Sequence, residues 1–169
     1  MDEMNRLISD MLAFARALKA EPLQSVNLAD LCEKLVERHR ELGEVRWPGA
    51  APCPWPIQPA ALERILGNLL GNALRYGEGK PVDMELLCEA GQARIRVSDR
   101  GPGIPAEAKE AVFRPFFRLE SSRNKDDGGS GLGLAIARQL ADAYGWEIRL
   151  LDRDGGGLTV ELVLPRSEE

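Results

Sequence analysis

Two pairs of alternating segments limit what this chain can fold into. Residues 81–89 and 92–98 carry apolar side chains at about every second position and are joined through Gly91. The segments "WEIRLLDR" and "GLTVELVLP" form a second pair around "DGGG" near the end of the sequence. This alternation and the glycine-containing turns predict two β-hairpins in one sheet.

Three helices are predicted to cover one face of that sheet. Residues 28–42 follow Asn27, a favoured N-cap residue, and residues 59–76 carry leucines and an isoleucine at helical spacing. A third helix is predicted from Gly131 to about Tyr144. The proline-rich residues 45–57 are expected to be irregular, with short strand pieces at best. The predicted fold is an α+β two-layer sandwich, in which a mixed sheet of about five strands packs against three helices.

The first 20 residues show a different apolar pattern. A stripe with alternating spacings of three and four runs through Met4, Leu7, Met11, Phe14 and Leu18. This spacing is typical of a helix in a coiled coil or bundle, and Pro22 ends it. We therefore expect residues 1–21 to be one helix of a bundle and residues 22–169 to be a separate domain. A helix packed on its own domain is the alternative.

Composition and charge exclude several classes of protein. The net charge of −5 gives no general basic footprint for nucleic acid. No apolar run approaches the roughly 18 residues needed to span a bilayer, and no signal peptide is evident. The chain is expected to be soluble and cytosolic. Its three cysteines, Cys32, Cys53 and Cys88, are odd in number and lack a CxxC spacing, so we expect core thiols in a reducing compartment.

Two asparagines stand four residues apart in the apolar segment "NLLGNALRY", residues 68–76. Asn68 and Asn72 therefore share a helix face, with Arg75 nearby. Asparagine is a poor helix former, because its amide competes for backbone groups. Amide oxygens suit Mg²⁺, a guanidinium suits a phosphate, and Tyr76 offers a ring for a base. Two satisfied, buried amides in a packed helix are the alternative.

Two further motifs follow the first hairpin. In "DRGPGIP", Asp99 closes a strand and the glycines allow the backbone to approach a ligand closely. Its carboxylate is a candidate acceptor for an exocyclic amine, although an ordinary Asp-Gly turn is the alternative. Pro105 is predicted to open a short helix to about residue 112. "FRPFFR", residues 113–118, reads as a hydrophobic hinge with basic flanks or as plain core packing. Residues 114–130 lack a period, which predicts a functional lid or disorder.

The last motif is "GGSGLGLAIARQLA", in which glycines precede and open a helix. Free backbone N–H groups and the helix dipole favour an anion at such a helix start. A dinucleotide-binding fingerprint does not fit, because the polar "RNKDD" and no apolar strand comes before it. A Walker motif does not fit either, since no GK[ST] follows. A flexible glycine linker is the alternative.

In this order the four motifs resemble those of the ATP-binding catalytic domain of sensor histidine kinases, part of the Bergerat-fold (GHKL) superfamily shared with DNA gyrase. "NLLGNALRY" is similar to the N box, "DRGPGIP" to the G1 box, "FRPFF" to the F box and "GGSGLGLAIA" to the G2 box. The resemblance covers about residues 24–165. It implies a Bergerat fold with ATP and Mg²⁺ as cofactors. Residues 1–21 would then be the end of the second helix of a dimerisation and phosphoacceptor domain.

The resemblance implies a role for each matched position. Asn72 should ligate Mg²⁺ on the ATP phosphates with Asn68 in support, Arg75 should lie near the phosphates, and Asp99 should accept from the adenine amine beside Tyr76. An arginine should reach the γ-phosphate, with Arg123 favoured over Arg114 and Arg118. The other positions implied in ATP binding are Gly101, Gly103, Ile104, Phe113, Gly129, Ser130, Gly131, Leu132, Gly133 and Leu134.

The resemblance also implies a protein-histidine kinase that transfers the γ-phosphoryl group of Mg-ATP to a histidine on another domain. The phosphoacceptor motif, a histidine followed by an acidic residue, is missing, because the single histidine, His39, is followed by Arg40. We expect His39 to be an ordinary surface or cap residue and the chain to bind ATP without phosphorylating itself. The implied partners are a phosphoacceptor domain, in a protein that is usually a homodimer, and a response regulator. The implied location is the cytoplasmic side of a bacterial inner membrane, reached only through regions that precede this sequence.

Residue 68 separates the branches of this superfamily. The resemblance implies that its hydrolases and serine kinases carry a glutamate at this position, which serves as a general base. Asparagine cannot take up a proton, so Asn68 favours a domain that positions ATP for an external nucleophile. The alternatives are an ATPase or serine kinase of another branch, and a nucleotide-binding module whose output is partner binding.

Overall fold

The computed structural model describes residues 8–9, 12, 21–114 and 133–166. The strands are β1 Gln24–Asn27, β2 Val45–Arg46, β3 Pro54–Ile57, β4 Val82–Cys88, β5 Gln92–Ser98, β6 Glu147–Asp152 and β7 Leu158–Pro165. The helices are α2 Leu28–His39, α3 Pro59–Tyr76 and α5 Gly133–Tyr144, with short 3₁₀ turns η1 Ala106–Ala108 and η2 Ala111–Phe113.

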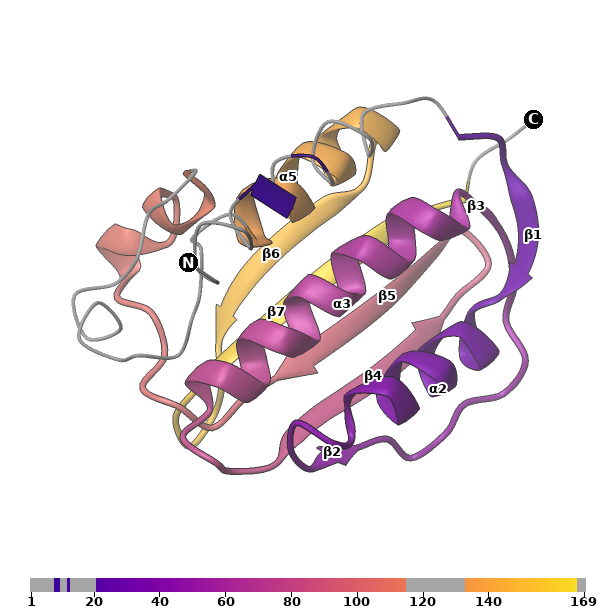
Figure 1. Cartoon of the computed structure of the whole chain (residues 1–169). Coiled ribbons are helices and arrows are strands. Elements are labelled where there is room, and N and C mark those ends of the chain that lie inside the picture. The colour runs from indigo at the N-terminus through magenta and orange to yellow at the C-terminus, as the bar shows by residue number, and fades with distance from the viewer. Residues whose placement is uncertain (1–7, 10–11, 13–20, 115–132, 167–169) are drawn as a thin grey trace.

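These elements form two layers (Figure 1). Five strands make one sheet in the order β2-β4-β5-β7-β6. The sheet is mixed, because β2 runs parallel to β4 while the other three neighbouring pairs are antiparallel. Helices α2, α3 and α5 lie across one face of it (Figure 1). The predicted α+β sandwich of five strands and three helices is confirmed.

The core lies between the sheet and α3, the central helix. Along β5, Ala93, Ile95 and Val97 are buried at every second position, as the alternation predicted. Buried side chains recur along α3 at helical spacing, namely Ala61, Leu62, Ile65, Leu66, Leu69, Leu70 and Ala73. Since both patterns meet at one interface, the register of β5 and the rotation of α3 are determined together.

Helix α3 has the predicted bounds, and both of its ends have identifiable causes. Pro59 occupies its first turn, where a missing N–H costs nothing. The side chain of Gln58 makes no capping bond; instead the carboxylate of Glu21 accepts from Ala60 N at 2.8 Å and from Ala61 N at 3.0 Å. After Tyr76 the chain turns away at Gly77, where a Cβ would lie 2.6 Å from the Ala73 carbonyl oxygen.

Other predicted elements are adjusted at their ends. Asn27 caps α2 as predicted, through a bond from Ala29 N to its Oδ1 at 3.1 Å. The helix ends at His39, three residues earlier than predicted, and His39 Nδ1 lies 2.8 Å from the Leu35 carbonyl oxygen. The helix predicted after Pro105 is replaced by η1 and η2, and α5 is described from Gly133 onwards.

The prediction of three core thiols is wrong for two of the cysteines. Cys53 and Cys88 form a disulfide that joins the segment before β3 to the end of β4. No local sequence signal marks this pairing, because the two residues are 35 positions apart and only the fold brings them together. Cys32 is a buried free thiol, as predicted, and burial raises its pKa to about 12.

The disulfide supports a second, smaller sheet, in which β1 pairs antiparallel with β3. The Oδ1 atom of Asn27 accepts from Cys53 N at 2.8 Å, and Leu28 N donates to the Cys53 carbonyl at 2.9 Å. Cys53 therefore holds the start of α2 through its backbone and β4 through its sulfur. This arrangement ties the segment that enters the domain to the main sheet.

Most of the N-terminal stripe lies outside the described residues. Ile8 and Leu12 are described as helical and exposed. Among the residues that the structure describes, no helix has the length and apolar character required to cross a membrane.

Candidate nucleotide-binding site

The polar side of α3 faces the first residue of α5. Asn68 Nδ2 donates to the Gly133 carbonyl at 3.2 Å. A Cβ on Gly133 would lie 3.6 Å from both polar atoms of the Asn72 amide, so α5 begins directly against both asparagines. Arg75 is exposed, and its Nη1 donates to Asn72 Oδ1 at 3.4 Å. The structure thus brings together Asn68, Asn72, Arg75 and Gly133, four of the predicted residues.

Asp99 follows β5 and is only 7% exposed. Its Oδ1 atom accepts from Gly101 N at 2.9 Å and from Leu158 N at 3.2 Å, while its own N–H donates to the Leu158 carbonyl at 2.9 Å. No hydrogen bond to Oδ2 comes from the part of the chain that the structure describes. Among the described residues, two backbone amides therefore hold one carboxylate oxygen and none holds the other, which makes Oδ2 a candidate acceptor for a ligand.

The pKa of Asp99 is raised, chiefly by burial. The amides of Gly101 and Leu158 and the charge of Arg153 act in the opposite direction, because each stabilises the ionised carboxylate. The carboxylate of Glu78 raises the pKa further.

Close backbone approaches join α3 to the segment that carries Asp99. A Cβ on Gly101 would lie 2.2 Å from the Tyr76 carbonyl oxygen, and one on Gly77 would lie 3.7 Å from Asp99 Cβ. Only glycine allows the first contact, so the end of α3 and the Asp99 segment are in direct contact. Gly103, with φ of 76°, places its Cβ position 3.3 Å from the Gly157 carbonyl oxygen. Tyr76, Asp99, Gly101 and Gly103 therefore lie in one region, next to the β6–β7 turn.

The remaining predicted residues divide into two groups. Ile104 and Leu134 are half-buried and pack against the core. Phe113 lies under the guanidinium of Arg138 of α5, with 4.7 Å from Cζ to the ring centroid, and Arg114 is exposed. The rest lie outside the described residues: Arg118, Arg123, Gly129, Ser130, Gly131 and Leu132.

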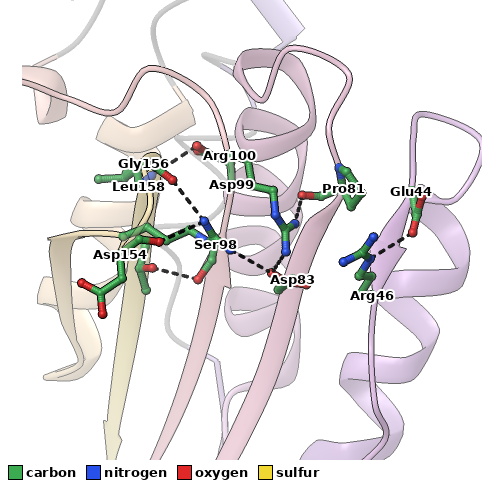
Figure 2. A network of polar contacts seen from close by, with 12 residues as sticks. Glu44, Arg46, Pro81, Asp83, Ser98, Asp99, Arg100, Asp154, Gly156 and Leu158 are labelled. Carbon is green, nitrogen blue, oxygen red and sulfur yellow. Dashed lines mark hydrogen bonds and ion pairs between the residues drawn. The ribbon is translucent and has the colours of Figure 1, made fainter.

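Sequence reasoning missed a set of charged residues next to Asp99. Arg100 Nη2 donates to Asp83 Oδ2 at 2.7 Å, and Arg100 Nη1 donates to the Pro81 carbonyl (Figure 2). Arg153, in the β6–β7 turn, lies 3.9 Å from the same oxygen of Asp83. Asp83 and Arg153 are 70 positions apart in the sequence, and no motif marks either of them.

Comparison with known proteins places the chain in a family. Residues 57–168 match the model described as histidine kinase-, DNA gyrase B- and HSP90-like ATPase. The chain belongs to this ATPase family. The sensor histidine kinase GtrS of Pseudomonas aeruginosa is 41% identical over 98% of this chain and 34% of its own length. The sensor histidine kinase CpxA of Escherichia coli is 32% identical over 96% of this chain and 37% of its own length. The chain thus spans about a third of these relatives.

Solved structures show the same fold. Full-length ShkA, in a complex with AMPPNP, superposes with a TM-score of 0.81 at 26% identity, over 99% of this chain and 37% of that one. The mycobacterial sensor histidine kinase MprB gives a TM-score of 0.69 at 28% identity, over 87% of this chain and 99% of that one. This ATPase domain therefore has the architecture of a histidine kinase ATP-binding domain, as the four motifs predicted.

The residues present fit a bound Mg²⁺ of the kind that this family implies. Asn68 uses its amide N–H₂ on Gly133, so its amide oxygen is not the atom engaged in that contact, and the Asn72 amide lies next to the same residue. Neutral amide oxygens suit a cation that also takes phosphate oxygens, because phosphates then balance its charge. Among the described residues no group of three or more His, Cys, Asp or Glu side chains could hold a metal ion instead.

Proposed function

We propose that this chain is the ATP-binding catalytic domain of a sensor histidine kinase, which positions Mg-ATP for transfer of the γ-phosphoryl group to a histidine on another domain. The observation that carries the proposal is the Asp99 carboxylate, with one oxygen held by two backbone amides and the other available. Such a carboxylate is a directed acceptor for the amine of adenine. The AMPPNP complex of ShkA, a structural relative, supports a nucleotide in this fold.

The proposed roles follow the geometry of the site. Adenine would lie between Asp99 and Tyr76, at the end of α3, with Gly101 and Gly103 shaping the pocket. The phosphates would lie along the polar side of α3, where Asn72 with Asn68 would hold Mg²⁺ and Arg75 would meet the phosphates. Bound Mg²⁺ would neutralise charge that develops on the transferring phosphoryl group. Arg75 would then exchange its contact with Asn72 for a phosphate oxygen.

The glycine-rich segment and the arginines that follow the F box complete the proposal. Gly129, Ser130, Gly131 and Leu132 would contact the phosphates before the first turn of α5, and Arg123 would reach the γ-phosphate. Gly133 already lies against the asparagines, so a phosphate there would meet both the start of α5 and the proposed Mg²⁺ ligands.

The proposal makes transfer a matter of positioning. In the proposed assignment, Asn68 stands where the resemblance implies that related hydrolases carry a general base, and an amide cannot accept a proton at neutral pH. Residue 68 would therefore not activate water, and the nucleophile that attacks the bound ATP would be the imidazole of a histidine on another domain. Residues 1–21 would belong to that domain's second helix, the intact protein would be a membrane-anchored homodimer with this domain in the cytoplasm, and a response regulator would receive the phosphoryl group.

The experiment measures Mg²⁺-dependent binding of a fluorescent ATP analogue to the parent chain, Asn72→Ala and Asp99→Ala. Both variants should bind much more weakly, and chelation of Mg²⁺ should reduce binding by the parent but change little in Asn72→Ala. Lack of binding by the parent, or full binding by both variants, would refute the site. Addition of a phosphoacceptor domain should produce acid-labile phosphate on its histidine, whereas rapid ATP turnover by this chain alone would contradict the role given to Asn68.

A further inference from the structure

The carboxylate of Asp83 joins two arginines from separate segments. Arg100, directly after Asp99, donates to Asp83 Oδ2 at 2.7 Å and also to the Pro81 carbonyl (Figure 2). Arg153 approaches the same carboxylate oxygen at 3.9 Å from the β6–β7 turn. The start of β4, the end of β5 and the β6–β7 turn are therefore linked through one carboxylate.

Arg153 also organises the turn in which it stands. Its Nη1 atom donates to the carbonyls of Asp154 and Gly156, at 3.2 Å in both cases. The three glycines that follow Asp154 adopt φ values of 86°, 105° and 111°, which L-residues rarely adopt. Because glycine has many accessible conformations, a run of three does not define a turn by itself. Backbone bonds from Arg153 N to the Gly157 carbonyl at 3.1 Å and from Gly156 N to the Arg153 carbonyl at 3.0 Å close the turn, and the guanidinium adds a further constraint to it.

The same turn sets the orientation of Asp99. Leu158 N, directly after the glycines, donates to Asp99 Oδ1 at 3.2 Å, and Asp99 N donates to the Leu158 carbonyl at 2.9 Å. A Cβ on Gly157 would lie 2.1 Å from the Asp99 carbonyl oxygen, so the turn packs directly on the backbone of Asp99. A displacement of the turn would therefore rotate the carboxylate away from its present direction.

We propose that Arg153 and Arg100, joined by Asp83, are positioning residues that hold Asp99 in the direction required to recognise a 6-amino purine. The inference rests on the proposed function, in which Asp99 binds adenine. None of the three needs to touch the nucleotide, because they act through the turn and through the backbone on both sides of Asp99. The selectivity of the site for adenine over a 6-oxo purine then depends on the β6–β7 turn.

The charges around Asp99 add a second consequence. Arg153 faces it from the turn and lowers its pKa, while Glu78, which follows α3, raises the pKa. Arg100 and Asp83 form an ion pair with each other beside it. Removal of the positive charge of residue 153 should therefore raise the pKa of Asp99 further, and the carboxylate would lose its acceptor character at a higher pH.

The experiment compares Arg153→Gln and Arg153→Lys with the parent chain and with Arg149→Gln. The control removes the same charge from β6, where Arg149 pairs with Glu147 at 3.0 Å. Affinities for ATP and ITP are measured by competition with a fluorescent ATP analogue, and the pKa of Asp99 is measured by ¹³C NMR titration without nucleotide.

Arg153→Gln should weaken ATP binding about tenfold, the lower end of the value of a hydrogen bond to a charged group, because the bond is misdirected and not removed, and it should change ITP binding less than about twofold. It should also raise the pKa of Asp99. Arg153→Lys should restore that pKa but only part of the selectivity, because an ammonium has one nitrogen and cannot contact the turn carbonyls and Asp83 from two separate nitrogens. Arg149→Gln should resemble the parent in both measurements.

An unchanged ratio of ATP to ITP affinity in folded Arg153→Gln would overturn the proposal. Should that variant not fold, Arg100→Lys is measured in the same way, and an unchanged ratio there has the same meaning. A parent chain that binds neither nucleotide refutes the proposed function instead. In that case the NMR titration still tests the network. An Asp99 pKa that is the same in the parent chain and in Arg153→Gln would show that the two residues are not coupled.

Discussion

Replacement of Asp99 by asparagine should reverse the base preference of the site. Gly101 N and Leu158 N both donate to Asp99 Oδ1, so the new side chain must keep its only oxygen in that position. Its N–H₂ group then replaces Oδ2 and points a donor at the donor amine of adenine. The site would lose a hydrogen bond to a charged acceptor, about 1.5–3 kcal/mol, and ATP affinity should fall about 10- to 150-fold.

The same change should strengthen the binding of ITP, because its 6-oxo group accepts where the amine of ATP donates. Competition with a fluorescent ATP analogue measures both affinities, and Asp142→Asn, an exposed carboxylate on α5, provides the control. The reasoning is refuted if the substituted chain keeps the parent ratio of ATP to ITP affinity. Equal losses for both nucleotides would show that Asp99 shapes the pocket without reading the base.

The substitution should also stabilise the nucleotide-free protein at neutral pH. The pKa of Asp99 is raised in the folded state, chiefly by burial, so folding favours its protonated form. The contribution of Asp99 to the free energy of unfolding is present below the pKa of an unfolded aspartate, about 3.9. It is lost as the pH rises through the pKa that Asp99 has in the folded protein. Asparagine carries no such cost. The melting temperature of Asp99→Asn should therefore exceed that of the parent at neutral pH, and the difference should disappear in acid.

Three further predictions concern the structure around the site. Glu21→Ala should destabilise the chain by about 1–2 kcal/mol, the value of a helix cap, because it removes the acceptor for two N–H groups at the start of α3; Glu21→Gln should recover part of this in urea unfolding. Gly157→Ala should prevent native packing on Asp99, measured as lost nucleotide binding and a lower melting temperature, since its Cβ would lie 2.1 Å from a carbonyl oxygen. Reduction of the Cys53–Cys88 disulfide should lower unfolding stability by up to about 4 kcal/mol, the loop-closure value for a separation of 35 residues. A denaturation midpoint that is the same with and without reducing agent would contradict that last expectation.

Local signals predicted most of the fold. Helix α3 was placed at its observed bounds because Pro59 marks its first turn and Gly77 follows its last residue. The strands of both hairpins were found from alternation in the sequence. Burial follows that alternation along β5, whereas Glu161 and Val163 of β7 are buried as well as the residues that alternate with them. The candidate site residues on α3 and after β5 were selected for a related reason, because polar residues interrupt an apolar pattern there.

What the sequence did not reveal depends on contacts between distant segments. Glu21 caps α3 from 39 positions away, and nothing in the local sequence of either segment indicates this. The ion pairs of Asp83 and the disulfide of Cys53 have the same character. A charged residue beside a strand end reads as a solvated surface residue until the fold supplies its partner. Such contacts are therefore the part of the site that only the structure could reveal.

Asn68 shows how one residue can serve both the fold and the proposed chemistry. Its Nδ2 donates to the Gly133 carbonyl and so ties the first turn of α5 to α3. An ionised glutamate has no donor and would place a carboxylate against that carbonyl. The amide therefore positions Gly133, at the end of the glycine-rich segment, against the two asparagines. An asparagine in place of a glutamate also lacks the carboxylate that could activate water. A change of Asn68 to Glu would have to supply a new partner for the Gly133 carbonyl before it could confer hydrolysis, which explains why the choice at this position involves α5 as well as the reaction.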